Sequence, residues 1–518
     1  MNLDFKAYNS FNLKHEMKTT CDMGQLIPVM CKEVIPGDIW RVHANLFMRL
    51  IPQLAPFMHT VNAYIHFFYE PCRFVKDNFV KMITKGFSGT DIVSWSYITS
   101  PSGGWTKYSL PDYFGLPVGV AGLDVDVMPI RGFWHIYNEW YLNENLQSYV
   151  SYSTGDGLDT TTPLTVPYRN WGSDYFTSAL PWAQRGNPVY LPLANSAVVG
   201  DGKTLGLTDG TNDFGLQKWN STGNLEPNSN AYNTNVGTTV STLGTYPANY
   251  TTIGVSTDPA KSGLKAVAQS ATINDIRVAF QVQRWMEKNA QSGVRWVEYL
   301  FSHFGERSSD LRLQRPEYLG GGRSVIVTSE VLQTSSTDST SPQGNMAGHS
   351  FTGQTTMSFT RRFEEFGYVY ALLSVLPKTQ YQDGIDRMWT RKTSLDYYDP
   401  LFSHLGQQGI LGKEICATGN SAYDEAVWGF CDRFDELRKA YSKVTADFRD
   451  TLDYWTMTRK FDVNNPPQLN SSFVTANDVT KRIFTVTNAN PCIVDIGFVI
   501  NVLRKLPKHG TPGLIDHG

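Results

Sequence analysis

The sequence predicts a mainly β protein in which strands from both ends of the chain meet in one sandwich, with helices and loops inserted between them. Three observations predict this: alternating apolar strands near each end, short amphipathic segments between them, and a composition rich in rings. Aromatic residues make up 13% and charged residues 18% of the 518 residues, and the usual charged share is about 25%. Few charges and many rings suit a protein with extensive buried contacts, within one chain or between subunits.

Two strands are predicted near the N-terminus, over residues 39–50 and 57–69. The second alternates between two sets of side chains, Val61, Ala63, Ile65 and Phe67 against Asn62, Tyr64, His66 and Phe68. A period of two with many β-forming residues is typical of a strand. Prolines and glycine before and between the two segments indicate where each strand ends.

Two further strands are predicted near the C-terminus, over residues 482–486 and 491–503. The longer one places five apolar side chains on one face, Val494, Ile496, Phe498, Ile500 and Val502. A nearly all-apolar face opposite a mixed one is what a sandwich strand requires. We therefore expect the two strand-rich ends to belong to one sheet system.

Helices are predicted between these ends, over residues 74–84, 131–146 and 272–290, with another after Gly293. Each places its large apolar side chains on one stripe of a helix. Thr272 and Asp275 have the spacing of a capping box, with Asp in the usual place of Glu or Gln.

The composition changes sharply over residues 200–262, which are rich in Thr, Asn, Gly and Ser. Segments of this kind favour turns and short strands, and long examples in compact domains are usually functional or disordered. Residues 333–358 have a similar character, and we expect both segments to leave the main body. The chain is thus divided into residues 1–199, a surface insertion at 200–262, and residues 263–518.

The charge and the cysteines limit the classes of function. The formal net charge is −3, so no global basic field attracts nucleic acid. Six cysteines lie far apart without a C-x-x-C pair, which favours isolated reduced thiols over a metal site. The start of the chain lacks a signal-peptide pattern and no apolar run approaches the roughly 20 residues of a membrane span. We therefore expect synthesis in a reducing cytoplasm.

No catalytic, cofactor-binding or metal-binding residues are predicted. His59 and His66 would point to opposite faces of a strand, and Glu364 and Glu365 would diverge. The glycine run at residues 319–324 lacks phosphate-loop spacing and precedes a strand-like segment, so we interpret it as a structural turn. No acidic loop of EF-hand type marks a calcium site.

Basic residues near both ends are the candidates for nucleic-acid contact. They are Lys14, Lys18, Arg504, Lys505 and Lys508. Such clusters can neutralise phosphates without reading sequence, and neighbouring rings can stack on unpaired bases. The alternative interpretation is that these are solvated basic ends.

Several strings together identify a family. FNLKHEMKTTCDMGQLIPVMCKEVIPGD and LAPFMHTVNAYIHFFYEPCRFV resemble the N-terminal part of Microviridae major capsid proteins, in particular the gokushovirus-type branch. The resemblance continues in order through MPIRGFWHIYNEWYLNEN and DYFTSALPWAQRG to the closing HGTPGL. The pair RLQRPEYLGGG and SPQGNMAG is especially specific, and residues 200–262 resemble the family least.

The resemblance implies an eight-stranded antiparallel jelly roll of the viral capsid type, with large helical and loop insertions. It implies that about sixty copies close into a T=1 icosahedral shell around a circular single-stranded DNA genome. The implied partners are a small basic DNA-binding protein, other minor virion proteins and a host surface receptor. No cofactor is implied, although a structural divalent cation is compatible with such shells.

The resemblance also implies a role for the insertion and a location for the protein. In the gokushovirus-type branch one insertion projects near the threefold axes, and residues 200–262 are its counterpart by position and composition. We expect this segment to contribute to host attachment. The protein is expected in the virion, and in the host bacterial cytoplasm during assembly.

Two other classes of protein are alternative interpretations of the sequence. A carbohydrate-active β-sandwich enzyme would suit the ring content, but it needs two facing carboxylates that the sequence does not provide. A phage receptor-binding or decoration protein would carry fibrous or repeated β segments, which conflicts with the full-length resemblance. Neither accounts for the sequence as well as a non-enzymatic capsid subunit.

Overall fold

The computed structural model describes residues 8–189, 196–200, 207–208, 213–214, 254–255, 264–268, 272–332 and 346–508. The chain divides into two compact units. One combines Met1–Arg185 with Glu287–Gly518, and the other is Gly186–Met286. The predicted insertion at residues 200–262 falls inside the second unit, and most of that range lies outside the described residues.

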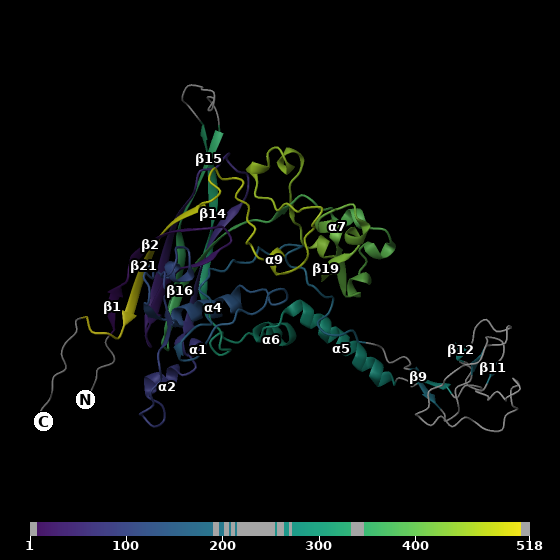
Figure 1. The fold of residues 1–518 in the computed structure, drawn as a ribbon, viewed down its shortest axis with the longest axis horizontal. Coiled ribbons are helices and arrows are strands. Elements are labelled where there is room, and N and C mark those ends of the chain that lie inside the picture. The colour runs from purple at the N-terminus through teal and green to yellow at the C-terminus, as the bar shows by residue number, and fades with distance from the viewer. Residues whose placement is uncertain are drawn as a thin grey trace, which may run out of the picture. The chain divides into compact units, whose positions relative to one another are not determined.

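The first unit is built on a large antiparallel sheet (Figure 1). Its hydrogen-bonded order is β1-β21-β4-β15-β14-β5-β16-β3, with β2 also paired to β21. The strands are β1 Asn9–Asn12, β2 His15–Cys21, β3 Leu26–Val34, β4 Ile39–Leu50, β5 Val61–Pro71, β14 Glu317–Leu332, β15 Met346–Arg362, β16 Gly367–Pro377 and β21 Cys492–Arg504.

This order gives two four-stranded halves, β2-β21-β4-β15 and β3-β16-β5-β14, which is the arrangement of a jelly roll. The predicted fold class is therefore confirmed. The strand count differs from the predicted eight, because β1 and β2 are successive segments along the same neighbour, β21.

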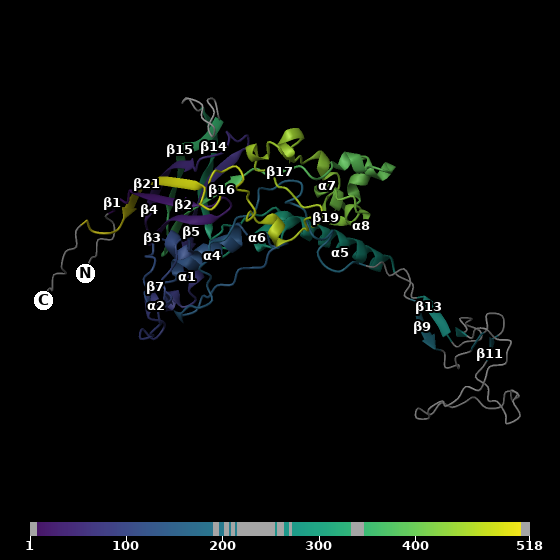
Figure 2. The ribbon, with the colours of Figure 1, turned by 45° about the horizontal axis from the view of Figure 1, so that its top comes forward.

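β14 joins the two halves. Its first part, up to Ile326, pairs with β5, and from Val327 onward it pairs with β15 (Figure 2). The sheet thereby folds over itself and encloses one apolar core. The core receives side chains from both halves, among them Trp40, Val42, Leu46, Met48, Val61, Ile65, Phe67, Val369, Leu373, Val494, Ile496 and Phe498.

The terminal strands agree closely with the sequence patterns. β4 begins and ends at the predicted residues, and β21 is shifted by one residue. The five side chains predicted on the apolar face of β21 are at most 1% exposed. The start of the second strand was predicted four residues too early, since β5 begins at Val61.

Three other predictions of local structure are wrong. Residues 482–486 form no strand, since Phe484 makes only one bridge, to Gln53. The apolar residues of this segment, Ile483 and Phe484, belong to a loop and place their side chains in the core. Residues 346–358 do not leave the body but belong to β15, while 333–345 lie outside the described residues.

The glycine run is part of β14 and not a turn. A bulge lies between Tyr318 and Gly320, where Gly320 has a φ of 129°. A Cβ on Gly321 would lie 2.4 Å from the carbonyl oxygen of Ile65. Glycine is required here because neighbouring backbone approaches too closely for any side chain.

The helices follow the predictions in part. They are α1 Cys72–Val75, α2 Phe79–Thr84, α3 Leu110–Tyr113, α4 Met128–Trp140, α5 Ile273–Ser292, α6 Trp296–Phe304, α7 Gly412–Ile415, α8 Ser421–Asp424 and α9 Ser471–Val474. The helix predicted over 74–84 is two short helices, and the one predicted over 131–146 ends at Trp140. The capping box of α5 is confirmed, because Thr272 Oγ1 accepts the Asp275 N–H and Asp275 Oδ2 accepts the Thr272 N–H.

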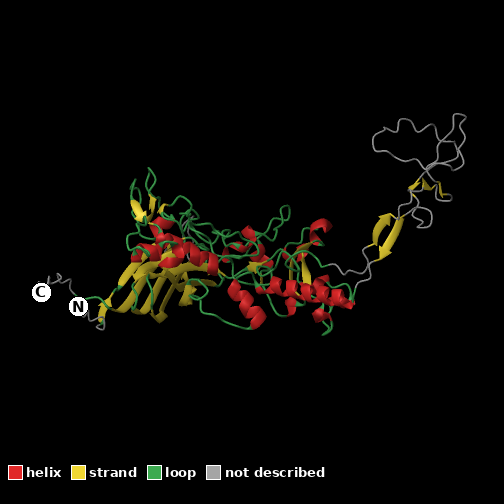
Figure 3. Ribbon diagram, turned by 90° about the horizontal axis from the view of Figure 1, so that it is seen from below, coloured by secondary structure: helices red, strands yellow, loops and turns green. Residues whose placement is uncertain are grey.

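α4 covers the outer face of the half formed by β3, β5, β14 and β16 (Figure 3). A second apolar cluster lies between them, which includes Phe68, Tyr370 and Leu372 from the sheet and Phe133 and Ile136 from α4. The contact is close, since a Cβ on Gly132 would lie 2.3 Å from Tyr370 Oη.

Smaller elements complete the chain. The short strands are β6 Ser96–Thr99, β7 Asp124–Asp126, β8 Gly157–Leu158, β9 Ser196–Gly200, β10 Leu207–Thr208, β11 Asp213–Phe214, β12 Gly254–Val255, β13 Leu264–Ala268, β17 Gln380–Tyr381, β18 Gln407–Leu411, β19 Val427–Asp432 and β20 Ser442–Lys443. The 3₁₀ helices are Arg387–Thr390, Ser394–Asp396, Phe402–His404, Asp435–Leu437, Ala446–Arg449 and Asp453–Trp455. None of the described helices is both long enough and apolar enough to cross a membrane.

Candidate nucleic-acid interface

The half formed by β2, β21, β4 and β15 presents its outer side chains to solvent. We call this surface the open face. On β4 it consists of Arg41, His43, Asn45, Phe47 and Arg49, all exposed, and every residue between them is buried. The cross-strand register aligns these side chains with those of both neighbours.

The open face follows from the alternation in the sequence of β4. Side chains of a strand point to opposite faces in turn, so the apolar residues enter the core and the others form the outer row. Across β21 the row continues through Ile493 and Asp495, which lie opposite Arg49 and Phe47. On β2 it continues through Lys18, opposite Asp495.

Three arginines of the open face carry uncompensated charge. Arg41, Arg49 and Arg362 are exposed, and none forms an ion pair with another residue that the structure describes. Lys18 instead contacts Glu16 at 3.1 Å and Asp495 at 3.3 Å. Hydrogen bonding to Glu16 and then to Asp495 raises the pKa of Lys18. The open face is therefore locally cationic on a chain whose formal net charge is −3.

The pairing of β1 and β2 with β21 spreads the five candidates along β21, from Lys18 opposite Asp495 to Lys505 and Lys508 beyond Arg504. Lys14, Lys18, Lys505 and Lys508 are exposed there. The Lys505 ammonium lies 5.4 Å from the centre of the Tyr8 ring.

Arg504 has a different environment from the other four. Its Nε donates to both carboxylate oxygens of Asp38 at 3.0 Å, and its Nη2 donates to Oδ2 at 2.6 Å. Asp38 is fully buried, and the Arg504 side chain is 18% exposed. The charge of this guanidinium is already balanced within the fold.

Sequence reasoning missed Arg41, Arg49 and Arg362, because each is a single charge within a strand and not part of a basic cluster. The signal was present in residues 41–49, where every second residue is basic, polar or aromatic and the residues between them are apolar. What the sequence did not contain was the fact that α4 covers the other half, while only the Lys107–Val118 segment, with α3, lies against part of this one among the described residues.

A hollow of about 320 Å³ lies on the opposite, helix-covered side of the first unit. It is lined by His66, Phe68, Trp140, Tyr141, Arg169, Asn170, Trp171 and Tyr318. His66 Nδ1 lies 2.8 Å from Tyr141 Oη. Burial, and the nearby Arg169 guanidinium, lower the pKa of His66 to about 4.

The other residues considered for chemistry have structural partners. His59 Nε2 lies 2.7 Å from the Lys378 carbonyl oxygen, and burial lowers the pKa of His59 to about 4. The six cysteines are free thiols, and Cys21 of β2 lies directly opposite Cys492 of the neighbouring strand β21. Within the described residues, no group of three or more His, Cys, Asp or Glu side chains is placed to hold a metal ion.

Comparison with known proteins gives consistent matches over the whole chain. The family model described as capsid protein (F protein) matches residues 6–514. The chain is 35% identical to capsid protein VP1 of Chlamydia phage 1, over 98% of this chain and 95% of that protein. It is 34% identical to capsid protein VP1 of Bdellovibrio phage phiMH2K, over 97% and 95%. It is 28% identical to capsid protein VP1 of Spiroplasma virus 4, over 98% and 95%.

Proposed function

The chain belongs to the capsid protein (F protein) family of Microviridae phages, and on that premise we propose that it is the subunit of a T=1 shell enclosing circular single-stranded DNA. About sixty identical copies would close the shell through repeated symmetric contacts. Its role is structural and not enzymatic. The protein acts in the virion after assembly in the host bacterial cytoplasm.

The open face is the surface that we assign to the genome. It supports the proposal because one half of the jelly roll is left uncovered and carries Arg41, Arg49 and Arg362 without carboxylate partners among the described residues. Contacts from such residues to phosphate oxygens carry no sequence information. Lys14, Lys18, Lys505 and Lys508 would add to this basic region, and Arg504 would contribute mainly by holding β21 to Asp38.

The net charge limits how much of the genome this shell can neutralise. A shell of about sixty subunits, each formally −3, is anionic overall. Most phosphate charge must therefore be offset by other molecules, for which we propose a small basic DNA-binding protein together with polyamines or divalent cations. Binding of single-stranded DNA to the isolated chain should be weak and should fall steeply with salt.

Assembly is the first test of the proposal. The full-length chain would be produced in bacteria, alone and together with its phage genome, and examined by cryo-electron microscopy. Closed particles with icosahedral symmetry and about sixty subunits are the expected result. A monodisperse monomer under all conditions would contradict the proposal, as would a larger shell.

For host attachment, we propose that residues 200–262 bind a receptor on the host surface. The two described strands that flank this range support a separable insertion. β9 pairs with β13 in an antiparallel ladder, in which Gly200 lies opposite Leu264. A two-residue Asn-Gly turn can join two such strands directly.

Replacement of residues 201–263 by Asn-Gly therefore tests attachment without disturbing the ladder. The variant should assemble into particles but lose adsorption to host cells. The matched control replaces the same residues by a Gly/Ser linker of equal length, which should behave like the short variant. Failure of both variants to form particles would show instead that the segment is needed for assembly.

A further inference from the structure

A second hollow, of about 650 Å³, opens on the open face, and we call it the open-face hollow. It is lined by Lys18, Thr19, Thr20, Phe47, Arg49, Lys107, Tyr108, Asp112, Tyr113, Val118, Ile493, Val494 and Asp495. Its size lies within the range of about 300–1,000 Å³ typical of small-ligand pockets. The loop from Lys107 to Val118 forms one wall, and β2, β4 and β21 form the floor.

Two of its rings are left exposed by the fold. Phe47 is 44% exposed and Tyr108 is 50% exposed. The Arg49 guanidinium lies 5.3 Å from the centre of the Phe47 ring. In a protein with 13% aromatic residues, most rings of the sheet are buried, so two exposed rings lining one hollow form a surface for stacking.

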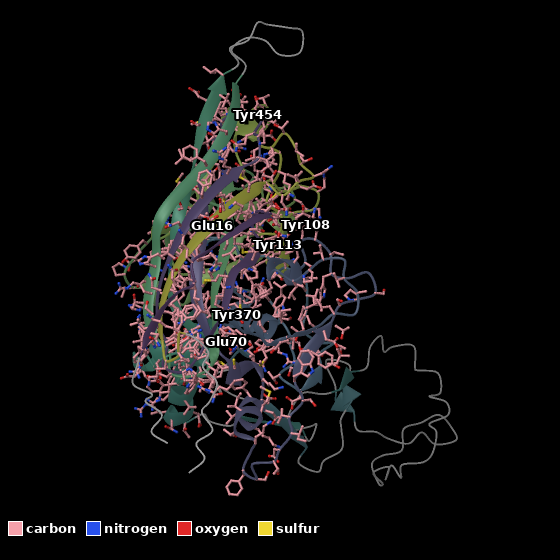
Figure 4. The ribbon with its side chains drawn as sticks, turned by 90° about the vertical axis from the view of Figure 1, so that its left-hand side faces the viewer. Glu16, Glu70, Tyr108, Tyr113, Tyr370 and Tyr454 are labelled. Carbon is pink, nitrogen blue, oxygen red and sulfur yellow. The ribbon has the colours of Figure 1, made fainter. Side chains whose placement is uncertain are left out.

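Tyr108 is held in an unfavourable conformation. Its φ is 66°, in the left-handed region that bulky residues avoid. Such conformations persist where the surroundings enforce them, often at functional sites. Here the Asp112 carboxylate accepts the Tyr108 N–H at 2.8 Å, and Tyr113 Oη donates to the Thr20 carbonyl oxygen at 2.9 Å. The first bond holds the wall together, and the second ties it to β2; Figure 4 labels both tyrosines.

The charges of the open-face hollow favour an anion. Both carboxylates have partners, Asp112 with the Tyr108 N–H and Asp495 with Lys18. Arg49 and Lys107 form no ion pair with another residue in the part of the chain that the structure describes. The lining holds three cations, Lys18, Arg49 and Lys107, and two carboxylates, so its formal charge is +1. A basic peptide would add to that positive charge, whereas the phosphate of a nucleotide would offset it.

We propose that the open-face hollow binds an unpaired nucleotide of single-stranded DNA. The base stacks on the ring of Phe47 or Tyr108, and the flanking phosphates contact Arg49 and Lys107. This inference rests on the proposed function, since it requires the open face to meet the genome. Each subunit would then hold one nucleotide at a defined site, in addition to the non-specific phosphate contacts of the open face.

Cross-linking of DNA to the full-length chain gives the direct test. Short oligodeoxynucleotides containing 5-bromouracil would be bound at low salt, irradiated, and the modified residues identified by mass spectrometry. Cross-links at Phe47 or Tyr108 are the expected result. Cross-links confined to other surfaces would overturn the inference.

Variants separate stacking from phosphate contact. Tyr108→Asn removes the ring while keeping a residue that tolerates a positive φ, and Phe47→Thr keeps a strand-forming residue. Each should weaken oligodeoxythymidine binding about 5- to 100-fold. Arg49→Gln and Lys107→Gln should each lower the slope of log affinity against log salt by about 0.7.

Two matched controls lie outside the hollow. Phe351 is 43% exposed on β15, so Phe351→Thr removes a comparable ring. Arg312→Gln removes a comparable exposed charge from the loop between α6 and β14, outside the open face. Loss of binding in Phe351→Thr as large as in Tyr108→Asn would refute a specific stacking site.

The same particles distinguish this inference from the proposed function. If wild-type particles close and contain DNA but the cross-links miss the hollow, the inference fails and the shell function stands. If no DNA-containing particles form at all, the proposed function fails. If cross-linking of the particles shows that another protein, and not DNA, contacts the residues of the hollow, the inference is also overturned.

Discussion

β16 and β4 lie in the two halves of one jelly roll, yet they are buried in different ways. Every residue of β16 is buried, whereas in β4 each outer residue from Arg41 to Arg49 is exposed. The difference comes from α4 and its neighbours, which cover the outer face of β16 and leave that of β4 free. One core can therefore support two surfaces, one closed for stability and one left for contacts with other molecules.

The largest effect should come from a ring on the covered outer face. Phe68 is 1% exposed between β5 and α4. Replacement of Phe68 by Ala should lower the free energy of unfolding by about 3–5 kcal/mol, because it leaves a cavity. Urea denaturation of the full-length chain measures this. A loss below about 1 kcal/mol would show that the covering layer contributes little.

The Arg504–Asp38 ion pair should come next. Arg504→Gln leaves the fully buried Asp38 carboxylate without its cation, which should cost about 3 kcal/mol of stability. Lys505→Gln, one residue later and exposed, is the control and should change stability little. Equal effects of the two changes in denaturation would contradict a structural role for Arg504.

The closeness of α4 to β16 can be tested by adding a single methyl group. Gly132→Ala would place a Cβ 2.3 Å from Tyr370 Oη. We expect a loss of about 1–3 kcal/mol from overpacking. The double variant with Tyr370→Phe, which removes the hydroxyl, should recover part of the loss in the same denaturation assay.

Acid should weaken the first unit through two buried histidines. Burial lowers the pKa of both His59 and His66 to about 4, so the unfolded chain takes up their protons first. Stability is thus present above pH 6.5 and is lost as the pH falls from there toward 4. Between pH 7 and 6 the two together should cost about 1 kcal/mol. His66→Gln should flatten this dependence, and an unchanged slope would contradict it.

The smallest effect is expected on the open face. Phe47→Ala removes a ring that is 44% exposed, so stability should change by about 0.5 kcal/mol or less. The contrast with Phe68→Ala is the sharpest test of the comparison, since both residues are phenylalanines on outer faces. A large loss for Phe47 would mean that the open face is covered within the folded subunit.

The sequence predicted the strands whose two faces differ. β4 and β21 alternate between apolar and other residues, and their bounds were found to within one residue. β15 was missed because its buried side is partly polar. Ser350 and Thr352 are at most 3% exposed, and they are satisfied by hydroxyl contacts with Thr328 and Ser324 of β14. Such cross-strand partners cannot be read from composition.

Only the terminal basic residues of the candidate interface were predicted from the sequence. The basic residues near both ends were predicted because clusters of charge are visible in a sequence. Of these, Lys18 lies on β2 and Arg504 on β21, and their contact with nucleic acid stays a prediction. Arg41 and Arg49 were missed, since single charges gain meaning only when the register places them in one row. The open-face hollow was equally out of reach, because the Lys107 loop and β4 meet only in the folded chain.

The position of β21 has a consequence for biosynthesis. This strand lies between β2 and β4, although it is the last of the described strands in the sequence. While the polypeptide is still on the ribosome, β2 and β4 have no partner for the edges that β21 will join, and contacts this distant in sequence form late. The body can close only after Arg504 has been translated and released. A chain that ends before Cys492 lacks the strand that joins β2 to β4.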